Sequence, residues 1–364
     1  MIRPFYTLGV WWRNRSFDRH PEKINHVSVP VLSVGNLTLG GTGKSPVVRF
    51  LALELQRLGF RVAVLSRGYR AEEQQENQNR PESRSVPEKN HFLTDATGKP
   101  LNDEGREMAR ALPTVRLYQN PDRTASAIRA ITEDDVNALI LDDGYQHRKL
   151  FRDGNILLID AEEPFGLTGK LFPCGTLREP MRNLSRADVI ILTHADRLNE
   201  RERHSLRAEL AERFPMKPNC VWVEAIHCPT VFISPTSERI PVETFSEKIS
   251  ETHSEPRFGA FCGIGKPTGF FRSLRQCGIT LVTEKIYPDH HVFSSDEMEK
   301  LTVWTQKHQL SALLCTEKDA VKLPATLPDG TPIYALQIEM AFLAGEEDFR
   351  SWIQKTVKEK ELFR

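Results

Sequence analysis

The chain has 364 residues and carries 49 Lys plus Arg against 49 Asp plus Glu, so its formal net charge is zero. This balance argues against a generally basic nucleic-acid-binding protein. With 39% hydrophobic and 27% charged residues, the composition is typical of a globular chain rather than a disordered one. No continuous apolar stretch is long enough for a transmembrane helix, and the N-terminus lacks the pattern of a secretory signal. The six cysteines contain no C-x-x-C pair, which predicts reduced thiols of a cytosolic protein rather than zinc ligands.

Short apolar runs of strand length alternate with longer amphipathic stretches over the first 227 residues. We expect strands at 31–34, 61–66, 114–118, 138–141, 156–160, 189–193 and 221–225. Helical spacing of apolar residues predicts helices at 46–58, 122–131 and 200–213. Repeated β-α units of this kind favour an α/β fold with a mostly parallel sheet and helices on both faces.

The remaining chain is expected to form a second, smaller α/β domain. Its strands are predicted at 258–262, 280–284 and 312–316, with helices at 269–276 and 296–308. A polar segment at 71–90 is interpreted as a surface insertion. The expected parts are an N-terminal helix (1–20), a main domain (21–227), a linker poor in apolar residues (228–257), the smaller domain (258–340) and a C-terminal helix (341–364).

A glycine-rich loop lies between the first expected strand and the first expected helix. It reads Gly40-Gly41-Thr42-Gly43-Lys44-Ser45, and its successive backbone N–H groups are suited to surround phosphate oxygens at a helix N-terminus. In such a loop Lys44 reaches the β- and γ-phosphates of a nucleotide and Ser45 binds Mg²⁺. The usual pattern has Gly six residues before the lysine, where this chain has Thr38. We interpret the segment as a phosphate loop (P-loop) in a P-loop NTPase-like fold.

Two adjacent carboxylates follow the expected strand at 138–141. Asp142 and Asp143 come at its carboxyl end, which is where ligands bind in an open parallel sheet. Aspartates at strand ends also form turns, but together with a P-loop they are candidate Mg²⁺ ligands.

These motifs combine with others into a resemblance to a known family. The segments are 33–46, Leu65-Ser66-Arg67-Gly68-Tyr69, 142–148, Gly175-Thr176-Leu177-Arg178-Glu179-Pro180, 260–265, Tyr287-Pro288-Asp289-His290-His291 and 316–322. In this order, from about residue 13 to 323, the chain resembles the tetraacyldisaccharide 4'-kinase family of lipid A biosynthesis. Thr38 matches that family, whereas Ser45, Tyr145 and the insertion at 71–90 depart from it.

The resemblance implies an activity and a location. We expect an ATP- and Mg²⁺-dependent kinase that transfers the γ-phosphate to the 4'-hydroxyl of the tetraacyldisaccharide 1-phosphate precursor of lipid A. It is expected to be a monomer that binds no nucleic acid and lies peripherally on the cytoplasmic face of the inner membrane.

The resemblance also implies roles for particular residues. Asp103 is the expected catalytic base, acting with His290 of the second domain. Without the resemblance, Asp103 would be interpreted as a helix N-cap and His290 as a turn residue. Asp143 and Glu179 are the expected metal carboxylates with Ser45, and Asp142 supports them. Arg178 is expected to stabilise phosphoryl charge, with a structural salt bridge as the alternative.

Further residues are candidates for contacts with the substrate and the membrane. Arg67, Arg123 and His147 are expected at the sugar or its 1-phosphate, because cationic groups recognise anionic headgroups. The segment 4–19 mixes aromatic residues with arginines, which suits a helix in a membrane interface; the alternative is a helix packed on the core. His194 is interpreted as a turn residue at a strand end.

Two other functions remain open from the sequence. One is a P-loop NTPase of the GTPase or metallochaperone type, which would prefer GTP and need no acceptor. The other is a non-catalytic regulatory module that binds a nucleotide. The Arg-Glu-Pro segment and the Asp-His-His segment favour the kinase, because neither alternative requires them.

Overall fold

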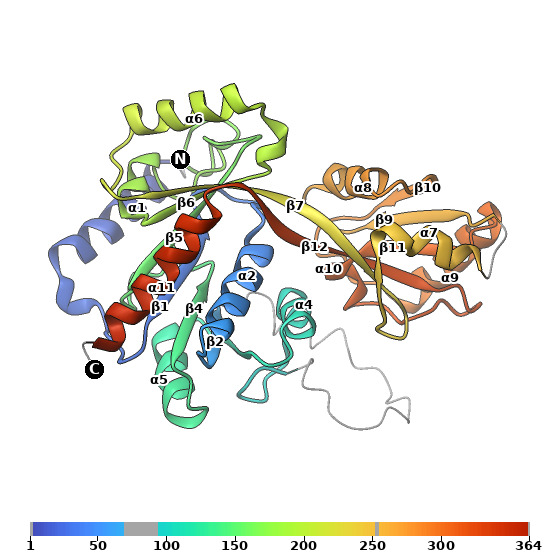
Figure 1. Cartoon of the computed structure of the whole chain (residues 1–364), viewed down its shortest axis with the longest axis horizontal. Helices are drawn as coiled ribbons and strands as arrows, with labels where there is room; N and C mark the ends of the chain where they lie inside the picture. The colour runs from blue at the N-terminus through green and yellow to red at the C-terminus, as the bar shows by residue number, and fades with distance from the viewer. Residues whose placement is uncertain (1–2, 69–93, 252–254, 363–364) are drawn as a thin grey trace. The chain divides into compact units, whose positions relative to one another are not determined.

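The computed structural model describes residues 3–68, 94–251 and 255–362, and the polar insertion expected at 71–90 lies outside this description (Figure 1). The chain divides into two compact units, which are described separately here. Unit 1 comprises residues 1–227 and 340–364, and unit 2 comprises residues 228–339. The chain leaves unit 1 within strand β7 (Val221–Ile233) and returns within strand β12 (Ile333–Ala344). Unit 2 is therefore inserted into unit 1.

Unit 1 is built on a parallel sheet with the strand order β7-β6-β5-β1-β4-β2-β3. Besides β7, its strands are β1 (Val31–Asn36), β2 (Val62–Ser66), β3 (Arg116–Gln119), β4 (Ala138–Asp142), β5 (Gly154–Asp160) and β6 (Val189–Thr193). The central strands are buried on both faces, which explains why they are continuous apolar runs. The parallel register brings their carboxyl ends to one edge, as in the pair Val34 and Asp142.

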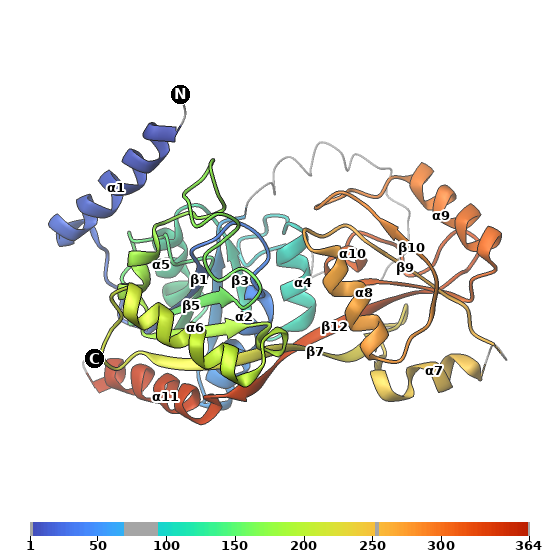
Figure 2. The same cartoon turned by 90° about the horizontal axis from the view of Figure 1, so that it is seen from above.

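Helices cover both faces of this sheet because alternate strand residues point to opposite sides. Leu32 belongs to a core formed with α2 (Lys44–Arg57), α4 (Asp103–Ala111) and α11 (Glu346–Leu362). Val31, its neighbour, packs in a core on the other face. The helices on that other face are α5 (Arg123–Glu133) and α6 (Glu200–Arg213) (Figure 2). The sheet with helices on both faces that we predicted is thereby confirmed.

Short segments complete unit 1. Helix α1 (Arg3–Arg19) precedes a 3₁₀ turn at Pro21–Lys23, and further 3₁₀ turns lie at Met181–Arg186 and Ala195–Arg197. Among the residues that the structure describes, no helix is both long and apolar enough to cross a membrane.

The strands of unit 2 pair in parallel in the order β10-β9-β11-β12. Its other elements are β8 (Arg239–Pro241), α7 (Val242–Ser250), β9 (Phe258–Cys262), α8 (Pro267–Gln276), β10 (Leu281–Ile286), α9 (Ser295–His308), β11 (Ala312–Thr316) and α10 (Glu317–Ala320). One core contains side chains of α7 and α8, and a second contains side chains of α9.

Residues 228–257 do not form the linker that the sequence led us to expect. They contain the second half of β7, strand β8 (which pairs with it antiparallel) and helix α7. Two of their few apolar residues belong to the core of unit 2: Phe232 and Phe245 are fully buried and stack at 3.9 Å between ring centroids. The C-terminal helix, which we expected as a separate part, is α11 and belongs to unit 1.

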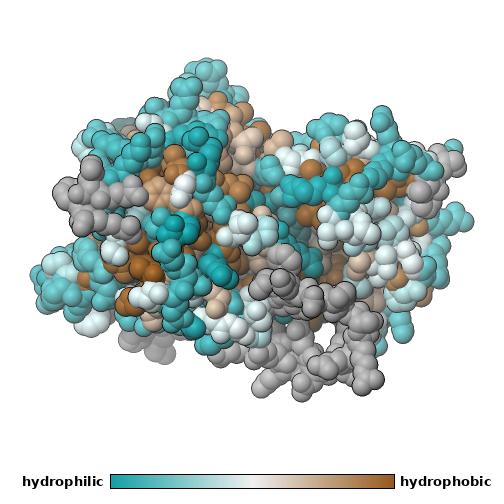
Figure 3. Space-filling model, turned by 60° about the horizontal axis from the view of Figure 1, so that its bottom comes forward, coloured by the Kyte–Doolittle hydropathy of each residue, from teal (hydrophilic) through white to brown (hydrophobic). Residues whose placement is uncertain are grey.

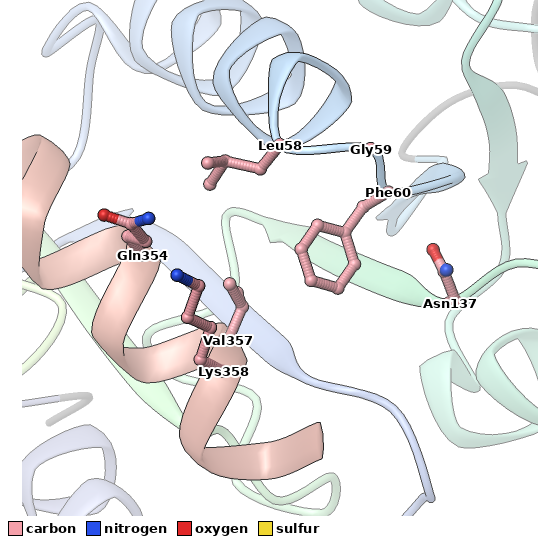
Figure 4. A pocket seen from close by; sticks show the side chains of 7 residues that line it. All are labelled: Leu58, Gly59, Phe60, Asn137, Gln354, Val357 and Lys358. Atoms are coloured by element: carbon pink, nitrogen blue, oxygen red, sulfur yellow. The ribbon is translucent and has the colours of Figure 1, made fainter. Parts of the chain in front are cut away.

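A small cavity of about 110 Å³ lies where helix α2 ends (Figure 4). Gly59, with φ of 90°, turns the chain there, and Phe60 and Val357 of α11 line the cavity. Phe60 and Asn137 precede strands β2 and β4, so this cavity is at the amino end of the sheet. The glycine-rich loop lies at the other end.

Candidate active site

The glycine-rich loop has the backbone conformation that phosphate binding requires. Gly40 and Gly43 have positive φ angles of 105° and 76°, and Gly43 is the N-cap of helix α2. Only glycine adopts these conformations at little cost. Asn36, at the end of β1, donates from Nδ2 to the buried Thr42 hydroxyl at 2.8 Å. The sequence of strand, left-handed turn and helix therefore directs loop amides toward one point.

The segment that carries Arg178 is fixed to this loop by backbone hydrogen bonds. The N–H of Leu39 donates to the carbonyl of Thr176 at 2.6 Å, and the N–H of Arg178 donates to the carbonyl of Leu37 at 2.6 Å. Arg178 follows directly from this pairing, so its side chain begins beside the P-loop.

Lys44, Asp143 and Arg178 form one charged cluster. The Nζ of Lys44 is 3.6 Å from Oδ1 of Asp143, and Nη1 of Arg178 is 2.8 and 2.6 Å from the two carboxylate oxygens. Burial by itself would raise the pKa of Asp143, but Lys44 and Arg178 outweigh it and lower the pKa. Asp143 is therefore a stable carboxylate next to the phosphate loop.

Asp142 has a different environment from its neighbour. Its Oδ1 is buried and has no hydrogen-bond partner within the described part of the chain. Burial is the main cause that raises the pKa of Asp142 to about 6, and Lys44 partly opposes it. A buried oxygen without a donor is suited to a cation, so the residues present fit Mg²⁺ here.

The number of protein ligands in this region is small. In the described ranges, no three His, Cys, Asp or Glu side chains converge into a group that could hold a metal ion. Mg²⁺ commonly takes one or two carboxylates and completes its octahedron with phosphate oxygens and water. Asp142, Asp143 and the hydroxyl of Ser45, which follows Lys44 at the start of α2, suffice for such a site.

Glu179 is not placed as we expected for a metal ligand. Its side chain is fully buried and accepts hydrogen bonds from Arg13 at 2.5 Å, from Asn183 at 2.7 Å and from Arg186. Two guanidinium groups pair with the carboxylate, and its role as a metal ligand stays a prediction. Glu179 anchors helix α1 and the 3₁₀ turn at 181–186 beside the site.

The residues expected at the anionic substrate differ in burial and in charge. Arg123, at the start of α5, is buried and approaches the carbonyl of Asp142 at 3.4 Å, and its Nε has no partner within the described residues. Burial, followed by Arg123 and Arg152, lowers the pKa of His147 to about 4, so this ring is neutral near pH 7. Arg67 is exposed and lies near enough to Arg123 to lower its pKa, although burial is the main cause.

The two residues of the expected catalytic pair lie in different units. Asp103 is 3% exposed, and its Oδ1 accepts from the N–H of Glu104 at 3.1 Å. Asn102, rather than Asp103, is the N-cap of α4. In unit 2, His290 has a φ of 60° and its Nε2 is 3.3 Å from Nζ of Lys318. Asp103 therefore lies at the start of a helix, and His290 lies in a turn.

Sequence reasoning missed several residues that build the site. Arg13 and Arg186 hold Glu179, and Gln146 donates to the carbonyl of Asn36 at 2.8 Å. His227 lies against the P-loop glycine Gly43. His227 lies in the middle of strand β7, and no local sequence pattern marks it as a site residue.

The parallel sheet, the left-handed glycine loop and the acidic strand end together define a nucleotide-binding protein of the P-loop class. The family model described as tetraacyldisaccharide-1-P 4'-kinase, LpxK, matches residues 2–358. The chain belongs to this family, which confirms the resemblance drawn from the sequence motifs.

Known relatives agree over nearly the whole chain. It is 35% identical to the tetraacyldisaccharide 4'-kinase of Anaeromyxobacter sp. (strain Fw109-5), covering 94% of this chain and 86% of the relative. It is 34% identical to that of Geobacter sulfurreducens, covering 92% and 86%. A crystal structure of LpxK from Aquifex aeolicus in complex with ATP is similar with a TM-score of 0.69 and 27% identity, covering 97% of this chain and 96% of that one.

Proposed function

We propose that this chain is the ATP-dependent kinase that phosphorylates the 4'-hydroxyl of a tetraacyldisaccharide 1-phosphate. The observation that carries the proposal is the family match over residues 2–358. The phosphate loop supports it, because Lys44 is ion-paired with an acid of the neighbouring strand end. ATP is the phosphate donor, and Mg²⁺ bound between its phosphates and the protein carboxylates would neutralise charge and orient the γ-phosphate.

Phosphoryl transfer depends mainly on positioning and on charge stabilisation. The amides of residues 40–44 and Nζ of Lys44 hold the phosphates, while Asp142, Asp143 and Ser45 hold the metal. Arg178 lies within 2.8 Å of Asp143 and is poised to stabilise negative charge that develops on the transferred group.

The acceptor hydroxyl needs a base. We assign Asp103 to this role, with His290 as its partner from unit 2. Asp103 is buried at the start of α4, where the amide end of the helix dipole lies. His290 adjoins Asp289 and Lys318. An ionised aspartate stabilises an imidazolium, so the pair can accept the proton of the hydroxyl.

Arg123, Arg67 and His147 are assigned to the anionic sugar headgroup. Arg123 has a buried Nε without a partner in the described residues, and the neutral His147 has a buried Nε2 in the same condition. Groups of this kind favour a ligand that supplies oxygen acceptors. A sugar bearing a 1-phosphate supplies them.

Helix α1 is assigned to the membrane surface and to the acyl chains. A cavity of about 680 Å³ opens beside it, lined by Leu8, Val10 and Trp11 on the helix and by Leu171 and Pro180 opposite. Leu8 and Trp12 are 60% and 69% exposed. Hydrophobic residues reach the surface elsewhere too (Figure 3), so exposure alone is not diagnostic.

Helix α1 carries arginines beside its exposed hydrophobic residues. The guanidinium of Arg15 lies 5.0 Å from the ring centre of Trp11, and Arg13 holds the helix to Glu179. Aromatic and basic residues together favour an anionic bilayer interface. We therefore place the protein on the cytoplasmic face of the inner membrane, bound peripherally.

The kinase assignment is tested by incubating the purified protein with labelled ATP, Mg²⁺ and lipid A disaccharide 1-phosphate in mixed micelles. The expected result is one new phosphate at the 4' position, with GTP a poor substitute. Lys44→Ala is the negative control. ATP hydrolysis that is independent of the lipid, or no transfer at all, would contradict the assignment.

The membrane assignment is tested by sedimentation with vesicles containing anionic phospholipid. The double variant Leu8→Ser, Trp12→Ser keeps the Arg13–Glu179 ion pair and removes exposed apolar surface from α1. It should bind vesicles more weakly while retaining ATP binding. Val303→Ser, which alters an equally exposed side chain of unit 2 (63% exposed), is the matched control. Equal sedimentation of all three proteins would sink the assignment.

A further inference from the structure

His227 occupies a position that the proposed chemistry does not use. It lies in strand β7, where residue 227 is the last of unit 1. Its imidazole edge is pressed against the P-loop, because a Cβ atom placed on Gly43 would collide with both Cε1 and Nε2 of the ring. Since Gly43 has a φ of 76° and caps helix α2, His227 contacts the turn that aims the amide of Lys44.

The Nε2 atom of His227 is buried and has no hydrogen-bond partner among the residues that the structure describes. Burial, followed by His194, lowers the pKa of this ring to about 3, so it is neutral in the physiological range. A neutral imidazole offers one N–H donor and one acceptor. Leaving a buried polar nitrogen unpaired is unfavourable, so a ligand that satisfies it gains affinity.

The far side of the ring is held in place. His194 stands edge-on to His227 with 4.3 Å between ring centroids, and its Nδ1 is 3.2 Å from Oδ1 of Asp160. Asp160, His194 and His227 come from β5, from the turn after β6 and from β7, which are successive strands of the sheet. The row ends at the phosphate loop, where the nucleotide must bind.

We propose that His227 is a further residue of the nucleotide site: its ring packs against Gly43 to hold the last turn of the phosphate loop, and its Nε2 hydrogen-bonds to an oxygen of the bound nucleotide. This inference rests on the proposed ATP-dependent function. Asp160 and His194 act through His227 and are positioning residues.

The inference is tested by measuring the Kd for ATP without any lipid acceptor, by titration calorimetry. His227→Leu fills similar volume but lacks the nitrogen, and it should raise the Kd about tenfold. His227→Gln places an amide nitrogen near the position of Nε2 and should stay within about twofold of wild type. His204→Leu, an exposed histidine of α6, is the matched control. Equal ATP affinity of His227→Leu and wild type overturns the hydrogen bond.

Two ligands identify which oxygen is contacted. If Nε2 binds a phosphate oxygen, inorganic triphosphate shows the same loss with His227→Leu as ATP does. If it binds a ribose hydroxyl, the loss appears with ATP and is absent with the matching deoxynucleotide. If His227→Leu weakens neither triphosphate binding nor the binding that depends on the ribose hydroxyl, the hydrogen bond is overturned.

The packing against Gly43 is tested separately. Gly43→Ala should abolish most ATP binding, and the double variant Gly43→Ala, His227→Ala should regain part of it, because the colliding ring is gone. In nucleotide-free protein, His227→Ala should speed amide hydrogen exchange at residues 40–45, whereas His227→Leu should not. No regain and unchanged exchange overturn the packing.

The same measurements separate this inference from the assigned kinase activity. Wild-type protein that fails to bind ATP contradicts the assigned function itself. Wild-type protein that binds ATP while His227→Leu binds it equally well contradicts only the role of His227.

Discussion

Both units place a glycine turn and a lysine between a strand and a helix, yet only one turn is built to receive an anion. In unit 1 the turn from Gly40 to Lys44 joins β1 to α2, and in unit 2 the turn from Gly263 to Lys266 joins β9 to α8. Gly40 and Gly43 are left-handed, whereas Gly263 and Gly265 do not have positive φ angles.

The acids beside these turns explain the difference. Asp319 in unit 2 is fully buried, accepts from the N–H of Gly263 at 3.0 Å and pairs with Lys322 at 2.9 Å. The Asp319 carboxylate thus accepts the hydrogen bond from Gly263 that a bound anion would otherwise accept. Asp143 in unit 1 is 36% exposed and leaves the loop amides free of any such contact in the described residues. Spacing of glycine and lysine alone therefore does not define a phosphate site.

The turn of unit 2 has a different use, since the N–H of His290 donates to the carbonyl of Gly263 at 3.2 Å. If this turn presents a catalytic histidine, Asp103→Ala and His290→Ala should each lower kcat by about 10²–10⁴-fold, far more than they raise the KM for ATP. The double variant should be scarcely worse than the poorer single variant. A double-mutant cycle on kcat at saturating lipid measures this, and additive losses would refute a joint role.

The lysines of the two turns, Lys44 and Lys266, should also differ in their effect on nucleotide binding and turnover. Lys44→Ala and Asp143→Ala should each lower turnover by about 10²–10³-fold, because both remove preorganised charge at the phosphates. Lys266→Ala, the counterpart in unit 2, should leave ATP binding unchanged. Thermal unfolding of each variant is the control for folding. Normal turnover in a folded Lys44→Ala protein would remove the distinction between the two turns.

The two acids should separate activity from stability. Asp319→Asn leaves the Lys322 ammonium without a counter-charge, and it should lower the free energy of unfolding by about 1–3 kcal/mol. Asp143→Asn should change that free energy by less than about 0.5 kcal/mol, because the site is partly exposed. Urea unfolding followed by circular dichroism measures both. The reverse order would show that Asp143 is the structural acid.

The pH dependence of stability provides a further test. Because the pKa of His147 is lowered to about 4, its contribution to stability is complete above pH 6.5 and is lost as the pH falls through 4. Compared with His147→Gln, the wild type should lose about 1 kcal/mol of unfolding free energy between pH 7.5 and pH 5, allowing for a half-buried ring. Parallel pH profiles of the two proteins would contradict a buried, neutral His147.

Sequence reasoning succeeded where local pattern dictates structure. The apolar run at 189–193 and the amphipathic run at 200–213 become β6 and α6 with the expected bounds. Sequence reasoning failed where the burial of a residue depends on contacts with residues distant in the sequence. Residues 228–257 look like a linker because they contain few apolar residues, and Phe232 and Phe245 come together only in the folded unit.

The site shows the same division. The phosphate loop is local, since its glycines determine its conformation. The ion pair between Glu179 and Arg13 could not be predicted because the two residues are 166 positions apart. His227 was missed for the same reason, since nothing near it in sequence indicates that its ring contacts Gly43.

The insertion of unit 2 within unit 1 has a consequence for synthesis of the chain. Helix α11 supplies Phe349, Ile353 and Val357, all fully or almost fully buried, to the core that supports the P-loop helix α2. A ribosome that has already produced the phosphate loop must still translate all of unit 2 before this core can close. The growing chain therefore exposes the apolar face of α2 until the last residues emerge, and unit 2 is free to fold first.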